Sequence, residues 1–300
     1  MTDSSGSTDP SGSTDSSGST DPSGPTDSSG STDPSPAAAT GPIRRRIGAL
    51  RGAVTFLTRI PVPGGCPSDW HDFRAAPWTI PVVGWVIGLP LAALVLVAGR
   101  ASAPWPTAVA GYLCLLYVLS GVTHADGLAD LGDAVAAHDP DRRRAVLADA
   151  DLGVGGVLAL GVTLLAVTLG VAALALPTTD PVVAARIVLA AEVGAKLAMA
   201  LAACFGTAAH EGLGSSLADP ATPAGALPAV VVALPVLFGV PAGALPAVLA
   251  ALCAAPVVAL VVGIRTRTWL GGVSGDVFGA INEVGRAVAL HAGVIVWAIA

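Results

Sequence analysis

The chain has 300 residues, of which 53% are hydrophobic and only 12% are charged. Soluble globular domains carry about 25% charged residues, so this composition excludes an ordinary soluble domain and predicts a helical membrane protein. The formal net charge of −6 comes from the first 42 residues, which hold six Asp and no Lys or Arg.

Residues 1–42 form a segment that we expect to be disordered. A Thr-Asp pair recurs every six residues between Ser, Gly and Pro, and residues 2–36 contain no aliphatic side chain. Such a segment cannot bury enough apolar surface to fold. It also lacks the basic start and the apolar stretch of a secretory signal. We therefore predict an acidic tail over 1–42 and a membrane domain over 43–300.

A basic amphipathic helix is expected to begin at Ile43. Its apolar positions recur at helical spacing, and they are Ile43, Ile47, Leu50, Val54 and Leu57. Arginines occupy positions between them, namely Arg44, Arg45, Arg46 and Arg51. A helix of this kind is suited to the anionic inner surface of a membrane.

Four apolar runs then approach the roughly 20 residues that a membrane-spanning helix requires. They cover residues 78–98, 105–122, 154–176 and 182–205. Residues 226–263 are long enough for two more spans, although several prolines interrupt them, and residues 287–300 are short for a crossing. The fold class predicted is an all-α polytopic helical bundle with about six or seven spans.

The basic residues predict the orientation in the cell membrane. With the amino terminus inside, twelve of the fifteen Lys and Arg residues fall on the cytoplasmic side, as the positive-inside rule requires. This arrangement places residues 123–153, 206–225 and 265–286 on one surface. We expect any chemistry to occur there.

The first acidic motif follows the second apolar run and reads His124-Ala-Asp126-Gly-Leu-Ala-Asp130-Leu-Gly-Asp133. On a helix, Asp126, Asp130 and Asp133 share one face because they are four and seven residues apart. Clustered carboxylates require cations or water, and oxygen ligands without Cys favour Mg²⁺. His124 is a candidate for orienting an acid or a substrate hydroxyl. The alternative is a solvated acidic loop.

A second acidic motif lies in another loop of the same predicted surface. Asp276 and Glu283 are seven residues apart, Asn282 precedes Glu283, and glycines come before Asp276. Together with the first motif, these residues are expected to complete a divalent-metal site that binds a diphosphate. The glycines are also explained as helix caps.

Several charged residues between and before these motifs are candidates for phosphate binding. Arg142, Arg143 and Arg144 are expected to clamp phosphates, or else to act only as inside charges that set the topology. Asp149 is a candidate ligand or helix cap. Arg59 is a candidate anion contact within a Pro-rich segment, which is otherwise a turn into the first span.

One charged pair lies inside an apolar run. Glu192 and Lys196 are four residues apart, which places them on the same side of a helix. We expect them to neutralise each other within the membrane.

Taken in order, four motifs of this chain resemble those of the cobalamin synthase family, adenosylcobinamide-GDP ribazoletransferase. They are Phe56-Leu-Thr-Arg-Ile-Pro-Val-Pro63, His124-x-Asp126-Gly-Leu-Ala-Asp130-x-x-Asp133, Asp149-x-x-x-Gly153-x-x-Gly156 and Gly271-Gly-x-x-Gly-Asp276-x-x-Gly-Ala-x-Asn282-Glu283. The resemblance implies a membrane enzyme that uses Mg²⁺ to join adenosylcobinamide-GDP to α-ribazole or its 5′-phosphate, with release of GMP.

The resemblance also implies roles for residues. Asp126, Asp130 and Asp133 would be the catalytic and metal-binding acids, and Asp276 would support the same centre together with Asn282 and Glu283. Asp151 departs from the family, in which a basic residue is frequent at this position, so phosphate binding is expected at the three arginines instead. The implied partners are the two substrates, the lipid bilayer and other enzymes of the corrinoid pathway, without nucleic acid.

Two alternatives remain open at this point. A CDP-alcohol phosphotransferase also uses an acidic helical motif in a membrane bundle, but its Asp-Gly-x-x-Ala-Arg is not matched, because Asp130 and Leu131 stand at the last two positions. A cation-coupled transporter would use the same acids to bind an ion. Transporter sites usually lie near the bilayer midplane, whereas these acids fall in loops on one side.

Overall fold

The computed structural model describes residues 41–137, 139–147 and 151–300, and at positions 140–142 and 144 it describes the backbone alone. The predicted tail over 1–42 therefore lies almost entirely outside the described residues. Gly41–Ala300 form one compact unit. In these ranges the regular elements are helices, with one isolated parallel bridge between Ala208 and Val273. The all-α fold class is confirmed.

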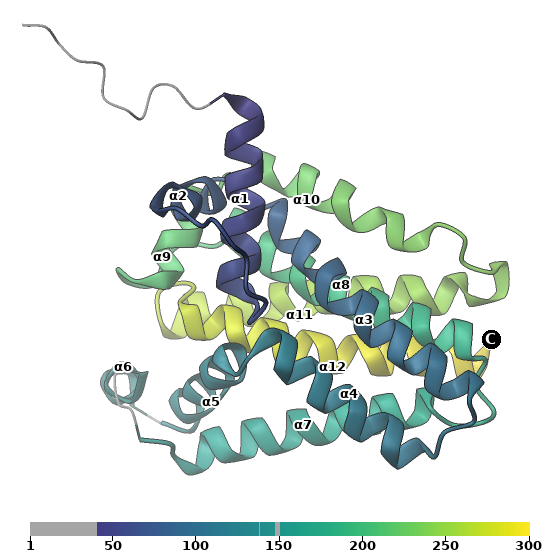
Figure 1. Ribbon diagram of the computed structural model, residues 1–300. Coiled ribbons are helices and arrows are strands. Elements are labelled where there is room, and N and C mark those ends of the chain that lie inside the picture. Colours follow the sequence, from purple (N-terminus) through teal and green to yellow (C-terminus); the bar gives the residue numbers. More distant parts are fainter. Residues whose placement is uncertain (1–40, 138, 148–150) are drawn as a thin grey trace, which may run out of the picture. The chain divides into compact units, whose positions relative to one another are not determined.

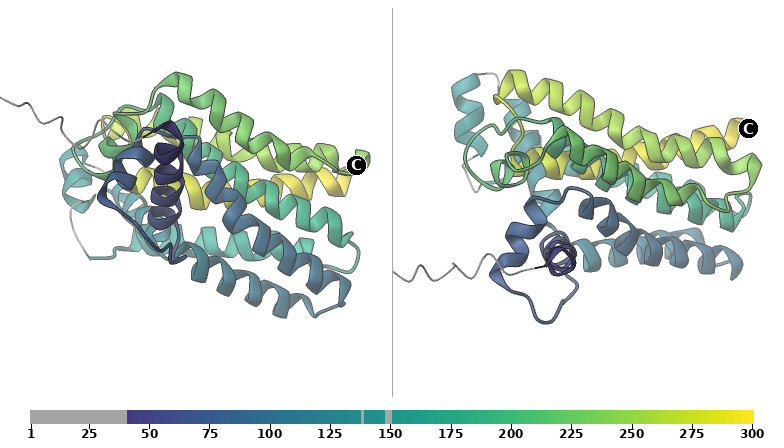
Figure 2. Two further views of the ribbon diagram at one scale, coloured as in Figure 1. Left: turned by 45° about the horizontal axis from the view of Figure 1, so that its top comes forward. Right: turned by 90° about the horizontal axis from the view of Figure 1, so that it is seen from above.

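Six long helices run roughly along one direction and form the body of the molecule (Figures 1 and 2). They are α3 (Thr79–Arg100), α4 (Trp105–Ser120), α7 (Val154–Leu174), α8 (Pro181–Phe205), α11 (Leu245–Trp269) and α12 (Gly275–Ile299). Four of the six, α3, α4, α7 and α8, begin within one residue of the apolar runs predicted from the sequence.

Helix α8 is the most buried of the long helices, and small residues let its neighbours approach closely. A Cβ added at Gly84 of α3 would lie 2.8 Å from Val193 Cα, and one at Gly194 would lie 2.7 Å from Leu252 O of α11. Backbone contact of this kind is typical of helices that associate in lipid. The core is therefore built from alanine and glycine contacts around α8 rather than from aromatic side chains.

The number of candidate spans is smaller than the number expected. Among the residues that the structure describes, four helices are long and apolar enough to cross a membrane, namely α3, α7, α8 and Ala242–Trp269. The pair formed by α4 and α5 (Thr123–Ala136) passes the same test together, but it bends by 95°. We treat α4 as the crossing part and α5 as lying beyond its end. The apolar helices make the chain a membrane protein with four or five spans by this measure.

Two predicted segments explain the difference. The run over 226–263 yields one long helix, α11, because its first part is divided into α10 (Ala226–Ala233) and the 3₁₀ turn Leu234–Leu237, whose second residue is Pro235. Residues 287–300 are not a separate short helix, since they continue α12 from Gly275.

Shorter helices gather at one end of this bundle (Figure 1). They are α1 (Pro42–Leu57), α2 (Pro67–Arg74), α5, α6 (Pro140–Leu147) and α9 (Leu213–Ala218). The bridge between Ala208 and Val273 ties the segment after α8 to the segment before α12 at the same end. The three regions predicted to share one surface, 123–153, 206–225 and 265–286, therefore contribute to this end.

Helix α1 runs across the long helices and is seen nearly end-on in the right-hand view of Figure 2. Ile43 and Ile47 are exposed on it, as the amphipathic pattern predicts. Arg51 instead faces α2, where its Nε and Nη2 donate to the Asp69 carboxylate at 2.5 and 2.7 Å. This hydrogen-bonded ion pair lowers the pKa of Asp69 to about 2, and it fastens α2 to α1.

Candidate active site

The break between α4 and α5 depends on Gly121. Its φ of 70° lies in the left-handed region, which favours glycine. A Cβ at Gly121 would also lie 2.5 Å from Arg59 Nε, and the Arg59 backbone N–H donates to Leu119 O at 2.7 Å. Arg59, a predicted anion contact, therefore lies against the turn that leads into the acidic helix, with its side chain exposed.

Helix α5 carries the first acidic motif along its whole length, so the helical arrangement predicted for Asp126, Asp130 and Asp133 is confirmed. Asp126 is exposed, whereas the other two are partly buried. Most of the motif's apolar residues are buried against the bundle, among them Leu128 and Leu131. Because that side of α5 is buried, its carboxylates face the open end of the bundle, where the shorter helices gather.

Two glycines bring α5 into backbone contact with α12. A Cβ at Gly127 would lie 2.7 Å from Asp276 Cα, and one at Gly279 would lie 2.7 Å from His124 O. Any larger side chain at either position would push the helices apart. This contact places Asp276, from the second acidic motif, beside the acids of the first, as the sequence predicts.

Burial and neighbouring carboxylates raise the pKa values of two acids at this contact, Asp130 and Asp276. Burial first, and then the charges of Asp276, Asp126 and Asp133, together raise the pKa of Asp130 to about 6. The pKa of Asp276 is also raised, by burial first and also by Asp126, against a lowering effect of its hydrogen bond from Ser274 and of His210. Repulsion between the acids is therefore real, and a cation would relieve it.

Asp133 has a different environment from the other two acids of α5. Its Oδ2 accepts from the Gly153 N–H at 2.8 Å, and its Oδ1 accepts from the Gly156 N–H at 2.9 Å. A Cβ at Gly153 would lie 2.3 Å from this carboxylate, so the glycines of the third motif make room for it. Asp133 thus caps the amino terminus of α7, and a metal or catalytic role for it stays a prediction.

The described side chains at this contact do not by themselves form a complete ligand set for a divalent cation. Within the described ranges, no three His, Cys, Asp or Glu side chains are grouped as a metal site. Mg²⁺, however, is usually held by one or two carboxylates, and water and substrate phosphates supply the other ligands. The oxygen donors of Asp126, Asp130 and Asp276, which repel one another, fit that requirement.

The second half of the second motif lies in the core of the bundle rather than with Asp276. Glu283 accepts from Arg286 Nη1 at 2.6 Å, and Arg286 also pairs through Nε with Glu192 of α8. Tyr112 OH donates to Glu192 at 3.3 Å. Arg286 is fully buried, so placing it among the inside surface charges was wrong: it forms ion pairs with two acids inside the bundle.

The network continues toward α5. Asn282 Nδ2 donates to Glu283 Oε1 at 2.9 Å, Lys196 Nζ donates to Asn282 Oδ1 at 2.7 Å, and Lys196 Nζ lies 3.5 Å from His124 Nε2. Glu192 and Lys196 were expected to neutralise each other, but their hydrogen bonds go to other residues. Glu192 accepts from Arg286 and Lys196 donates to Asn282, and both partners belong to α12, which packs against α8.

His124 stands where this network meets the acidic end. Burial lowers the pKa of His124 well below its usual range, and the positive charges of Lys196 and Arg286 lower it further. The ring is therefore neutral. Its role as a substrate contact stays a prediction at this point.

The basic segment after α5 is only partly described. Arg143 Nε donates to Ala137 O at 2.9 Å, and its guanidinium lies 5.5 Å from the centre of the Trp269 ring. Arg143 thus closes the carboxyl end of α5 and attaches it to α11. The side chains of Arg142 and Arg144 and the whole of Asp149 lie outside the described residues, so phosphate binding there stays a prediction.

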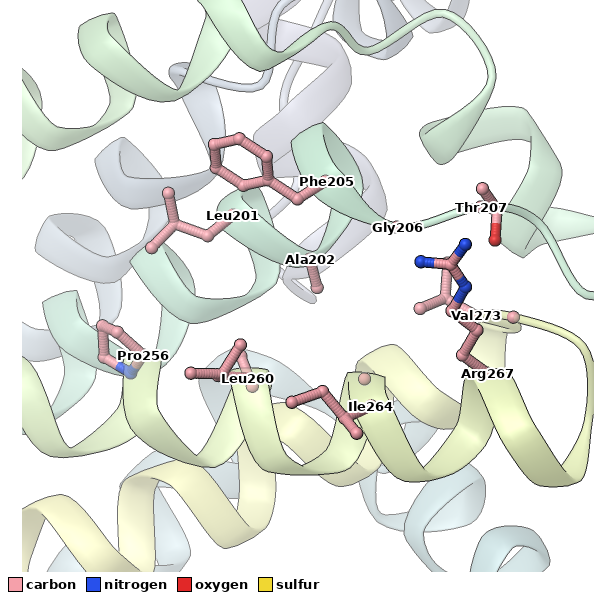
Figure 3. A pocket seen from close by; sticks show the side chains of 13 residues that line it. Leu201, Ala202, Phe205, Gly206, Thr207, Pro256, Leu260, Ile264, Arg267 and Val273 are labelled. Carbon is pink, nitrogen blue, oxygen red and sulfur yellow. The ribbon is translucent and has the colours of Figure 1, made fainter.

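Two cavities of the molecule differ in whether acidic residues line them. A cavity of about 160 Å³ is lined by residues that include His124, Asp126 and Asp276. A larger one, of about 350 Å³, lies between α8 and α11 and is shown in Figure 3. Its lining is apolar apart from Thr207 and Arg267, and it includes no acid. The smaller cavity therefore belongs to the candidate active site, and the larger one does not.

Comparison with known proteins identifies the family of this chain. Residues 49–294 match the model of a family described as cobalamin-5-phosphate synthase. The chain is 46% identical over 259 residues to the adenosylcobinamide-GDP ribazoletransferase of Haloquadratum walsbyi, which covers 84% of this chain and 98% of that protein. It is 45% identical over 258 residues to the protein of the same name from Halorubrum lacusprofundi, covering 83% and 97%. No solved structure matches the chain.

Proposed function

We propose that this chain, which belongs to the cobalamin-5-phosphate synthase family, joins adenosylcobinamide-GDP to α-ribazole or its 5′-phosphate and releases GMP. The products are adenosylcobalamin or its phosphate, so the enzyme is a transferase of cobalamin biosynthesis. The similarity to the named relatives covers nearly their whole length, which favours this activity over a CDP-alcohol phosphotransferase or a cation-coupled transporter.

The observation that carries the proposal is the meeting of Asp126, Asp130 and Asp276 where α5 touches α12. In the reaction, the ribazole hydroxyl oxygen forms a bond to the corrinoid-side phosphorus, and the bond from that phosphorus to the bridging oxygen breaks, so that GMP leaves. A diphosphate repels the incoming oxygen. A divalent cation held by Asp126 and Asp276 would neutralise the phosphate charge.

The proton of the attacking hydroxyl also needs an acceptor. Asp130 has a pKa of about 6, which suits a group that takes up and releases a proton near neutral pH. Asp133 is less suited, because both of its oxygens already accept hydrogen bonds from α7. We therefore assign proton acceptance to Asp130.

The phosphates and the membrane complete the proposal. Arg59 lies at the turn into α5, and the arginines Arg142 and Arg144 follow α5, so these side chains are assigned to the substrate phosphates. We place this end of the bundle at the cytoplasmic face of the cell membrane, because the basic helix α1 crosses it (Figure 1) and basic segments are retained inside.

The test is GMP release by the purified protein in liposomes. GMP should appear only when adenosylcobinamide-GDP and α-ribazole, or its 5′-phosphate, are both present, and EDTA should stop its release until excess Mg²⁺ is added. Release of GMP without either ribazole would indicate hydrolysis instead of transfer. No release with any pair of substrates would refute the proposed function.

A further inference from the structure

The larger cavity begins where α8 and α11 separate. A Cβ at Gly194 of α8 would lie 2.7 Å from Leu252 O of α11, so the two helices touch at that level. Closer to the end where the shorter helices gather, they leave a cavity of about 350 Å³ between them. Figure 3 shows the side chains of both helices that line it. We call this cavity the α8–α11 groove.

The groove is apolar along most of its length, and one side of it faces out of the bundle. On α11 its lining recurs at helical spacing from Pro256 to Arg267, which is about 16 Å of helix. Phe205, Leu260 and Ile264 also line it, and they are 65%, 63% and 57% exposed. Since α8 and α11 have the length and hydropathy of membrane spans, the open side of the groove faces lipid.

One end of the groove is polar. The Val273 N–H donates to Thr207 O at 2.8 Å, which joins the segment after α8 to the segment before α12. Figure 3 shows Arg267 reaching from α11 toward these segments. Within the described part of the chain, its guanidinium forms no ion pair and no hydrogen bond, and the lining includes no acid. The groove therefore ends at an uncompensated positive charge.

The length and the charge of the groove fit one kind of ligand. The hydrocarbon core of a bilayer is about 30 Å thick, so the chains of one leaflet extend over about 15 Å. The groove follows α11 over nearly that length and ends with Arg267 near the end of the span, the level at which lipid phosphates lie. An arginine binds a phosphate through charge-assisted hydrogen bonds, and no acid in the lining would repel it.

A soluble ligand fits the apolar part less well. The base and the ribose of a nucleotide carry donors and acceptors, which are costly to bury without partners. The side chains between the two helices offer no such partners, since Leu201, Ala202, Pro256 and Ala259 are apolar. A hydrocarbon chain needs none and is favoured by the same lining.

We propose that the α8–α11 groove binds one anionic phospholipid, with a hydrocarbon chain along α11 and the phosphate on the guanidinium of Arg267. Thr207 places a hydroxyl group at the same polar end. The inference goes beyond the proposed function and does not depend on the reaction. It requires two separate features of the chain, the charge of Arg267 and the open space along α11, so each can be tested alone.

The first test removes the charge. Native mass spectrometry of the purified, delipidated protein in detergent gives the dissociation constant of the first bound lipid. Dioleoyl phosphatidylglycerol should bind more tightly than dioleoyl phosphatidylcholine, which has the same chains but no net charge. Arg267→Gln should weaken phosphatidylglycerol binding about tenfold, because a charge-assisted hydrogen bond is lost. Arg265→Gln, an exposed position of α11 outside the lining, is the matched control and should bind as the wild type does.

The second test fills the groove. Gly263 lines it, and a Cβ there meets nothing within 4 Å, so Gly263→Leu adds a side chain where there is open space. The leucine should displace part of the lipid chain and weaken binding of both lipids about tenfold. Gly161→Leu is the control, because a Cβ at Gly161 of α7 also meets nothing within 4 Å and lies outside the groove.

Several results would overturn the proposal. They are equal affinity of the wild type for the two lipids, equal effects of Arg265→Gln and Arg267→Gln, and unchanged binding in Gly263→Leu. Glycerol 1-phosphate binding as tightly as the whole lipid would assign Arg267 to a soluble phosphate. A raised KM for adenosylcobinamide-GDP in Arg267→Gln, measured without phospholipid, would assign the groove to that substrate. If one variant does not give a monodisperse protein, the other variant and its control decide.

Discussion

Carboxylates occur in two regions of this molecule, and the two regions treat them in opposite ways. In the core, Glu192 and Glu283 are buried and share the guanidinium of Arg286. At the end of the bundle, Asp126, Asp130 and Asp276 approach one another, and within the described part of the chain none of them forms an ion pair with Lys or Arg. Asp276 and Glu283 even belong to the same helix, two turns apart.

The difference separates structural acids from acids that await a ligand. A buried carboxylate with a bound arginine has its charge compensated inside the fold, and removing the partner is costly. At the end of the bundle, burial and the neighbouring carboxylates instead raise the pKa of Asp130. Carboxylates therefore take different roles according to their partners, and each role predicts a different response to mutation.

The largest effect on stability is expected in the core. Arg286→Met would leave Glu192 and Glu283 buried without a cation, which should destabilise the protein by about 3–5 kcal/mol. The thermal unfolding midpoint in detergent, followed by tryptophan fluorescence, measures the effect. Arg265→Met, at an exposed position, is the matched control and should unfold as the wild type does. Equal midpoints for the two variants would refute the structural role of Arg286.

At the open end the corresponding change should affect activity instead. Asp126→Asn removes a charge that would hold the cation, so GMP release should fall by about 10²–10³-fold, the usual cost of losing one electrostatic contact to a transition state. The unfolding midpoint should not fall, because the change reduces repulsion. Asp219→Asn, an exposed acid of the same end, should retain full activity. If both variants were equally active, Asp126 would have no role in catalysis.

The contact between the two acidic motifs can be weakened without touching an acid. Gly127→Ala would place a Cβ 2.7 Å from Asp276 Cα, and forcing α5 away from α12 should cost about 1–3 kcal/mol together with activity. Gly161→Ala in α7 is the control, since nothing lies within 4 Å of that Cβ. Unchanged activity in Gly127→Ala would show that the close approach of the helices is dispensable.

The smallest effect concerns pH in the absence of metal. The pKa of Asp130 is about 6 in the folded protein, against an ordinary value of 3.8, so between these values the folded state retains a proton that the unfolded state loses. The stability contributed by that proton is therefore lost as pH rises toward 6.

Midpoints measured in EDTA from pH 4.5 to 7 test this. Solvent screening limits such an effect to about 0.2–1 kcal/mol, or about 1–3 °C in the midpoint. Asp130→Asn should remove the decline, and Mg²⁺ should reduce it. A midpoint in the variant that falls as much as in the wild type would assign the effect to other groups.

Much of the fold could be predicted from the sequence because bilayer thickness fixes the length of an apolar run. The starts of α3, α7 and α8 agree with the predicted runs to within one residue for that reason. The 95° bend after α4 could not be predicted, since it depends on the single left-handed residue Gly121 within a continuous apolar run. The proline-rich region was predicted as two spans because hydropathy does not show where α10 ends.

The sequence could predict only those parts of the site that depend on spacing within one helix. Spacing along one helix placed Asp126, Asp130 and Asp133 together, but it could not reveal that Asp133 caps α7. The partnership of Arg286 with Glu192 joins residues 94 positions apart, which no local pattern reports. The sequence showed only that Glu192 lies inside an apolar run, which indicated that it is buried but did not identify its partner.

The most direct test of the central claim is binding of Mn²⁺, a paramagnetic substitute for Mg²⁺, measured by electron paramagnetic resonance in the presence of adenosylcobinamide-GDP. We expect a bound Mn²⁺ signal in the wild type and in Asp219→Asn, and its loss when Asp126 and Asp276 are both changed to Asn. Undiminished Mn²⁺ binding by that double variant would contradict a cation site formed between α5 and α12.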